Sequence, residues 1–490
     1  MDTEIGISRR AFMRRAAGGA AALTAGRFGF AQEIAKKPPN IILILADDCS
    51  AREFGCYGNA ANRTPNLDGL ARTGVMFKTC WASPICGPSR AMIMTGRYGF
   101  RTRWFHNDMK PAQGQQGFNL AEDNLIFAQP LKEAGYATAI CGKWQMRGEE
   151  KQYGFDEHCM WRAIQGEFEG PIEPEEGNLP GRAARYWHPA VVKNGQQLPT
   201  AEEDYGPDIY TDFVIDFAGR HGGRPFLVYY SMPLTHITWD FDLKKMGYVA
   251  TPELDEQGRK TGRKGEPSLK ADVEYVDYLI GRIVKGLEEL GIRQNTIILF
   301  TCDNGTAGYG KGVTAGERGP LVPLIVNGPG VVQPLGPSDA LVDFSDVFPT
   351  LVELAGAKLP DGYVLDGHSF VPVLRGGKPS CRDWIFSNYA DKRFLRDNRW
   401  LLDGNNAFWD CGDNRSDEGY KDVTDSKDPE VLAARKRFEE ILQGLPAPAP
   451  DDPLMALFAQ LRAKKKGQKR KAGQPLQPKS SKKGQSRSPS

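Results

Sequence analysis

The chain of 490 residues has only six histidines, and its nine cysteines include no Cys-x-x-Cys pair. These absences argue against the zinc sites that proteins build from paired cysteines and histidines. Long apolar runs are also absent: the stretch from Ala16 to Ala25 is short and rich in Gly and Ala. A membrane-spanning helix needs about 20 apolar residues. We therefore expect no integral membrane segment in the mature form.

The formal net charge of +2 conceals an uneven distribution. Residues 1–31 carry five Arg against two acids, and residues 462–490 carry eleven Lys and Arg and no acid, which leaves a net charge of −12 between them. The basic tail, residues 463–490, is predicted to be disordered. It could hold the protein near an anionic polysaccharide or a membrane surface, or be a solvated extension without function. Because it lacks interleaved aromatic residues, no nucleic-acid partner is expected.

The amino terminus has the pattern of an export signal. Ser8-Arg9-Arg10-Ala11-Phe12 is a twin-arginine motif, followed by the short apolar run and by a cleavage position after Ala31. Residues 1–31 are therefore predicted to be a twin-arginine signal peptide, with the twin-arginine translocase as partner and a periplasmic or secreted location. The alternative is a chance Arg pair in a basic amphipathic helix.

Buried strands alternate with helical segments along the chain. Helical spacing runs over residues 65–72, 124–134, 207–220, 269–290 and 345–354, and the alternation predicts a doubly wound α/β sheet. Ligands of such sheets bind outside the carboxyl ends of the strands, so polar residues that follow strands can converge. Four apolar runs are followed by such residues: Ile41–Leu45 by Asp47 and Asp48, Tyr136–Ile140 by Lys143 and Gln145, Phe226–Tyr230 by His236, and Thr296–Thr301 by Asp303 and Asn304. A fifth apolar run, Val322–Val326, instead comes after its polar residue, Lys311.

The acids that follow two of these strands suggest a metal site. Asp47, Asp48, Asp303 and Asn304 offer only oxygen donors, which favours a hard cation such as Ca²⁺, with Mg²⁺ as the alternative, over zinc. Paired acids at a strand end can also form a solvated turn.

A short motif points to a specific chemistry. Cys86-Gly87-Pro88-Ser89-Arg90, with Thr95-Gly96 five residues further on, matches the signature Cys-x-Pro-x-Arg…Thr-Gly. On this motif the chain resembles a type I, formylglycine-dependent (Cys-type) sulfatase of the alkaline phosphatase superfamily. The likeness covers about residues 38–375 and continues more weakly to about residue 445. It implies an alkaline phosphatase-like doubly wound sheet with a small C-terminal antiparallel α+β subdomain.

The resemblance also implies a mechanism. Cys86 would be oxidised by a formylglycine-generating enzyme to an aldehyde, whose hydrate attacks the sulfur of a sulfate ester and expels the alcohol. The hydrate's second hydroxyl then collapses the sulfated adduct, so that no water has to attack a sulfate diester.

Roles for the other site residues follow from the same resemblance. Arg90 would hold the charged diol, Lys143 and Lys311 would contact sulfate oxygens, and His236 would protonate the leaving alcohol or bind sulfate. The formylglycine at position 86 would bind the cation together with Asp47, Asp48, Asp303 and Asn304. At the position of Gln145 the family commonly has a histidine, a candidate base. Glutamine can hydrogen-bond the diol but cannot take a proton.

The chain is predicted to hold a catalytic domain (residues 38–375) and a C-terminal subdomain (residues 380–445). Within the catalytic domain, residues 161–205 form a long insertion rich in Gly, Pro and Glu. Long loops in compact domains are often functional, so we expect substrate specificity to reside there.

Three functions are compatible with the sequence. The first is hydrolysis of sulfate monoesters on carbohydrate. The second is hydrolysis of phosphate or phosphonate esters by the same fold, because an electropositive pocket does not separate these anions. The third is a catalytically silent sulfated-glycan-binding homologue in which Gln145 reflects a loss of turnover.

Overall fold

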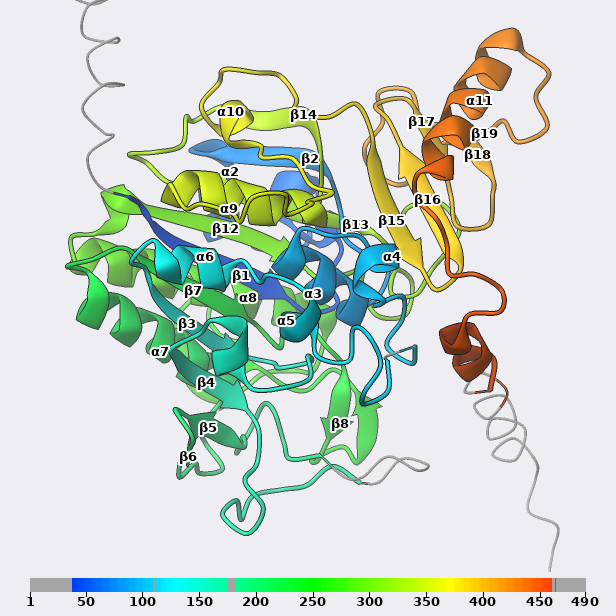
Figure 1. The fold of residues 1–490 in the computed structure, drawn as a ribbon. Coiled ribbons are helices and arrows are strands. Elements are labelled where there is room, and N and C mark those ends of the chain that lie inside the picture. Colours follow the sequence, from blue (N-terminus) through cyan, green and yellow to red (C-terminus); the bar gives the residue numbers. More distant parts are fainter. Residues whose placement is uncertain (1–37, 110, 175–181, 461–462, 464–490) are drawn as a thin grey trace, which may run out of the picture.

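The computed structural model describes residues 38–109, 111–174, 182–460 and 463. The predicted signal peptide lies outside these residues, as does all of the predicted basic tail except residue 463. The described chain is an α/β protein with a ten-stranded sheet, and a five-stranded antiparallel sheet lies beside it (Figure 1). No helix among the described residues is long and apolar enough to cross a membrane.

The large sheet has the strand order β14-β2-β13-β12-β1-β7-β3-β4-β5-β6. Its central strands β12, β1, β7 and β3 run parallel, and β4 continues in the same direction. The strand bounds are β1 Asn40–Ala46, β2 Val75–Trp81, β3 Ala137–Gly142, β4 Glu157–Trp161, β5 Val191–Lys193, β6 Gln196–Gln197, β7 Phe226–Ser231, β12 Thr296–Cys302, β13 Leu321–Asn327 and β14 Gly336–Asp343.

The central strands form because their sequences are apolar throughout. Strand β1 is completely buried, and Ile41 pairs with Leu227 of β7 on one side and Ile297 of β12 on the other. A strand covered on both faces by helices has no solvent side, so it reads as a continuous aliphatic run instead of an alternating one. The sequence could therefore predict these strands.

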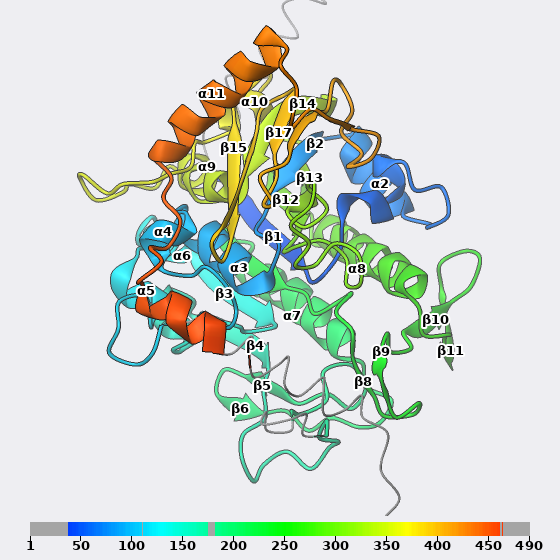
Figure 2. The same cartoon turned by 90° about the vertical axis from the view of Figure 1, so that its right-hand side faces the viewer.

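Helices cover both faces of this sheet (Figure 2). Helices α2, α7 and α8 lie over one face and α3, α6 and α9 over the other. The bounds are α2 Pro65–Arg72, α3 Cys86–Thr95, α4 Gly99–Thr102, α5 Leu120–Asp123, α6 Ala128–Glu133, α7 Gly206–His221, α8 Leu269–Glu289, α9 Val347–Ala355, α10 Val371–Leu374 and α11 Pro429–Gln443.

Two expectations about the elements need correction. Residues 124–134 are not one helix, because Asn124 is extended between α5 and α6 and the Leu125 N–H donates to the Tyr363 hydroxyl (2.9 Å). Strand β13 runs antiparallel to β12, so its beginning, and not its end, lies at the edge where the parallel strands finish. This direction explains why Lys311 precedes its strand while the other site residues follow theirs.

The C-terminal part contains the predicted antiparallel sheet, with order β15-β16-β17-β18-β19. Its strands are β15 Ile385–Tyr389, β16 Lys392–Arg396, β17 Trp400–Leu402, β18 Phe408–Asp410 and β19 Lys421–Asp422. The two sheets are joined by a buried ion pair between Glu317 and Arg396, and the Trp81 indole N–H also donates to Glu317 (2.7 Å). The domain boundaries stay predictions.

The remaining strands form two small hairpins outside the main sheet. Strands β8 (Thr238–Asp240) and β9 (Lys245–Gly247) make one, and β10 (Pro252–Leu254) and β11 (Lys260–Lys264) make the other.

Candidate active site

Asp47 and Asp48 follow β1 in a tightly held turn. Asp48 has a φ of 62°, a left-handed conformation that aspartate tolerates better than most residues. Its N–H donates to Asp303 Oδ1 (3.0 Å), and the Thr235 hydroxyl donates to its carbonyl oxygen (3.0 Å). With the backbone fixed in this way, both carboxylates reach the same partner: Cys86 Sγ lies 3.6 Å from Asp47 Oδ1 and from Asp48 Oδ1.

The predicted metal ligands converge. One ligand atom each from Asp47, Asp48, Cys86 and Asp303 lies within 4.8 Å of the others, and all four residues are buried. Asn304 joins them, because its Nδ2 donates to Asp48 Oδ1 (2.9 Å). Its Oδ1 is buried and has no hydrogen-bond partner among the described residues. A buried oxygen without a partner, beside three carboxylates, fits a hard cation such as Ca²⁺.

Cys86 is the first residue of α3, and polar side chains nearby hold the loop that leads into this helix. Ser89 Oγ donates to the carbonyls of Ser83 and Ile85 and accepts from the Ser83 N–H (2.9 Å). The next N–H, of Gly87, donates to Asn107 Oδ1 (2.8 Å). Burial, and then the Asp303 carboxylate, raise the pKa of the Cys86 thiol well above its usual value. An unmodified thiol here stays protonated and is therefore a poor nucleophile.

Three cationic side chains face the three carboxylates. Arg90 Nη2 donates to Asp303 Oδ2 (2.7 Å), Lys143 Nζ to Asp47 Oδ2 (2.6 Å) and Lys311 Nζ to Asp48 Oδ2 (2.7 Å). Burial alone would lower the pKa of Arg90, but the carboxylates outweigh it and raise that pKa. The formal charges of the six side chains cancel, so a divalent cation would leave the pocket with a net charge of +2.

Lys143 is positioned by a close approach of two strand ends. Gly142, with φ 95°, ends β3 so near β7 that a Cβ atom would lie 2.0 Å from the Ser231 carbonyl oxygen. The Lys143 N–H donates to that oxygen (2.8 Å), and Ser231 Oγ donates to the Lys143 carbonyl (2.7 Å). Ser231 Oγ also accepts from Arg90 Nη1. Only glycine permits this packing, which places Lys143 beside Asp47.

His236 lies at the rim of the cluster. Its Nδ1 is 2.5 Å from the Ile237 carbonyl oxygen, so Nδ1 carries the proton, and Nε2 lies 3.7 Å from Asp48 Oδ2. Burial of the imidazole lowers the pKa of His236. The Asp47 carboxylate opposes this shift, and the positive charges of Arg185 and Lys143 add to it. The imidazole therefore presents Nε2 to the pocket.

Gln145 lies partly buried in the loop after Lys143. The structure thus gathers the predicted Cys86, Arg90, Lys143, His236 and Lys311 around Asp47, Asp48, Asp303 and Asn304, with Gln145 in the adjoining loop. Sequence reasoning missed Ser231, Thr235 and Asn107. No motif marks them, because their importance comes from contacts with residues far away in the sequence.

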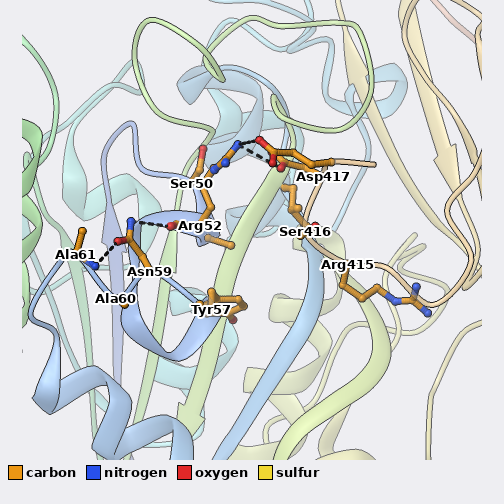
Figure 3. A pocket seen from close by; sticks show the side chains of 13 residues that line it. Ser50, Arg52, Tyr57, Asn59, Ala60, Ala61, Arg415, Ser416 and Asp417 are labelled. Atoms are coloured by element: carbon orange, nitrogen blue, oxygen red, sulfur yellow. Dashed lines mark hydrogen bonds and ion pairs between the residues drawn. The ribbon is translucent and has the colours of Figure 1, made fainter. Parts of the chain in front are cut away.

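A second polar pocket, of about 380 Å³, lies between the loop after Asp48 and the β18–β19 connection (Figure 3). Its Arg52 is paired with Glu418 (2.7 Å) and Asp417 (3.4 Å). None of the predicted site residues lines it. The chemistry is therefore expected at the Asp47–Cys86 cluster.

A buried group of carboxylates that could hold a cation, next to an arginine and two lysines, fits a class of protein, namely the hydrolases of anionic esters. The comparisons narrow this class. The family model Sulfatase matches residues 39–357, and the chain belongs to the sulfatase family, the sulfuric ester hydrolases.

Similar proteins include dog N-acetylgalactosamine-6-sulfatase, 30% identical over 71% of this chain and 68% of the relative, and human arylsulfatase D, 28% identical over 76% and 74%. Among solved structures, Ps i-CgsB superposes with a TM-score of 0.65 at 24% identity, covering 82% of this chain and 92% of that one. BT4656 in complex with its substrate D-glucosamine-2-N,6-O-disulfate gives 0.62 at 22% identity, covering 84% and 97%. These structures support the fold.

Proposed function

We propose that this protein is an exported sulfatase that removes sulfate monoesters from carbohydrate, using a formylglycine made from Cys86 and one bound Ca²⁺. The observation that carries the proposal is the convergence of the Cys86 thiol with Asp47, Asp48 and Asp303 in one buried cluster. A relative named N-acetylgalactosamine-6-sulfatase, and a neighbour of the same fold whose stated substrate is D-glucosamine-2-N,6-O-disulfate, support a carbohydrate substrate. The twin-arginine motif supports export, with the translocase and a formylglycine-generating enzyme as partners.

The residues of this chain have separable tasks. Asp47, Asp48, Asp303 and Asn304 would hold the cation, which would supply positive charge for the sulfate oxygens. The hydrated aldehyde at position 86 would supply the nucleophile.

Lys143 and Lys311 would exchange a carboxylate partner for sulfate oxygens when substrate enters, since each ammonium group already donates to a carboxylate of the cluster. Arg90, held by Asp303 and Ser231, would stay in place and orient the residue at position 86. His236 Nε2 faces the same pocket and would contact the leaving alcohol. These donors and positive charges would surround the sulfate and would stabilise the charge that develops during cleavage.

The first test is the mass of the tryptic peptide Thr79–Arg90 from protein produced with a formylglycine-generating enzyme; it contains the unmodified Cys80 as an internal control. The expected result is an aldehyde at position 86 and release of sulfate from sulfated sugars, with Cys86→Ala inactive. An unmodified thiol in protein that nevertheless releases sulfate would refute the mechanism. Faster hydrolysis of matched phosphate esters would refute the assignment to sulfate.

A further inference from the structure

A groove of about 490 Å³ lies between the described parts of the insertion, residues 161–174 and 182–205, and the β8–β9 hairpin. The two segments lie together at the same end of the molecule in both views (Figures 1 and 2). Trp187, Trp239 and Phe241 are among the residues that line it. Aromatic walls of this kind suit the apolar face of a sugar ring.

Arg185 lines this groove and is unusual among the buried arginines. Its residue surface is only 3% exposed, yet Nε and Nη1 are buried without a hydrogen-bond partner, and it makes no ion pair in the part of the chain that the structure describes. The guanidinium carbon lies 4.1 Å from the centre of the Trp161 ring. By contrast, Arg90, Arg382 and Arg396 each pair with a buried acid. The fifth buried arginine among the described residues, Arg293, has no ion pair either, but it donates to the Thr296 carbonyl (2.8 Å) and to Asn327 Oδ1. A buried charge without a counter-ion is costly, so the presence of one here points to an anion that binds there.

The acids of the groove do not neutralise Arg185. Glu169 and Glu202 line the groove but are exposed to solvent, and Asp242, also exposed, pairs with Lys264 (3.2 Å). Asp240 is buried but accepts from the backbone N–H groups of Asp242 and Leu243.

The groove adjoins the candidate active site. Tyr186, next to Arg185, places its hydroxyl 2.7 Å from the His236 carbonyl oxygen and 2.8 Å from that of Pro233. Both carbonyls belong to the segment that carries His236 to the cluster. A substrate whose sulfate occupies the cluster can therefore extend along Tyr186 towards Arg185.

We propose that Arg185, supported by Trp161, binds a second acidic group of the sulfated sugar, either another sulfate or a uronate carboxylate. Both groups present the paired oxygens that a guanidinium binds through two parallel hydrogen bonds. This inference rests on the proposed function and names its substrate class: sugars that carry at least two negative charges. In this proposal Arg185 determines specificity and does not contact the sulfate that is cleaved.

The experiment compares wild type, Arg185→Gln and Arg185→Lys, each with its formylglycine content measured by mass. The substrates are 4-methylumbelliferyl sulfate and disaccharides with one sulfate, with two sulfates, or with one sulfate and a uronate. Wild type should prefer one of the doubly charged sugars. In Arg185→Gln, KM for that sugar should rise about 10- to 100-fold, the effect of losing a hydrogen bond to a charged group, with kcat little changed. The preferred sugar identifies the second group as sulfate or carboxylate.

Controls separate the possible failures. Arg263→Gln removes an exposed charge that is paired with Glu253 and should leave the preference unchanged. Calorimetry of the preferred sugar with Cys86→Ala, with and without Arg185→Gln, measures binding without turnover. An equal loss on the aryl sulfate, or no change on any sugar, would overturn the role of Arg185. Mature wild type that cleaves none of the substrates, the aryl sulfate included, would instead overturn the proposed function.

Discussion

Replacing Glu317 by glutamine should strongly destabilise the junction between the two sheets. The side chains of Glu317 and Arg396 are both 0% exposed and form an ion pair, and Tyr420 also contacts the carboxylate. In Glu317→Gln the Trp81 indole keeps an acceptor, but the guanidinium loses its only carboxylate partner among the described residues. Its other contacts are neutral: the Tyr420 hydroxyl (3.1 Å), the Asn414 carbonyl (3.1 Å) and Cys411 Sγ (3.6 Å).

Breaking one side of a buried pair costs about 3–5 kcal/mol, because the other charge stays buried without compensation. Since the total free energy of unfolding of a protein is about 5–15 kcal/mol, this is a large fraction. Urea unfolding followed by tryptophan fluorescence should show the loss directly, with Trp81 as a reporter at the junction. Arg396→Met should cost a similar amount by leaving the carboxylate unpaired.

The decisive variant is the double replacement Glu317→Gln with Arg396→Met. It removes both charges, so it should cost clearly less than the sum of the single replacements. The reasoning is refuted if Glu317→Gln changes the free energy of unfolding by less than about 1 kcal/mol, the range of exposed pairs, or if the two effects add.

Three further predictions concern the metal, the replaced histidine and pH. Calcium at 100 times its Kd should raise the free energy of unfolding of wild type by about 2.7 kcal/mol. Asn304→Ala should reduce the calcium-dependent rise in Tm, and a rise as large as that of wild type would exclude Asn304 as a ligand. Gln145→Ala should lower kcat, and Gln145→His should at least preserve it. If kcat is unchanged in both variants, residue 145 takes no part in catalysis. The Arg220 guanidinium lowers the pKa of Glu157 to about 2; partial burial opposes this shift and His221 adds to it. The ionised Glu157 therefore stabilises the fold at pH values above its unfolded pKa, near 4.5, and this stabilisation is lost as the pH falls towards 2. Because this pair is partly exposed, Glu157→Gln should remove less than about 1 kcal/mol of acid-dependent stability, measured by urea midpoints across this pH range; an unaltered slope would contradict the assignment.

The central sheet could be predicted because its strands are recognisable from their own sequences. Ile41–Leu45 and Thr296–Thr301 are buried on both faces and are apolar throughout. Helix α2 was predicted with its observed bounds, since Pro65 suits the first helical position. Strand direction has no comparable signal, so the antiparallel course of Val322–Val326 was missed. The break at Asn124 depends on Tyr363, which is far away in sequence and was equally hidden.

The candidate site could be predicted where motif and strand end coincide. Asp47, Asp303 and Cys86 are recognisable from local sequence, and they can converge because β1, β12 and β2 all end at the same edge of the sheet. The supporting contacts were not predictable, because Ser231 looks like any strand-end serine until Arg90 donates to it. Arg185 was part of a noted insertion, but only the structure shows that its charge is buried and without a partner.

The burial of Cys86 sets an order of events in the life of the chain. The folded residue is 1% exposed, and the turn beside it is closed by a contact between Asp48 and Asp303, 255 residues later in the sequence. Under the proposed chemistry, an oxidising enzyme can reach the thiol only before this late-made segment arrives. Maturation and folding would therefore compete in time, and export through the proposed twin-arginine signal would come after both. Chains synthesised faster than they are oxidised would be folded, stable and permanently inactive, so the specific activity of a preparation should depend on how it was expressed.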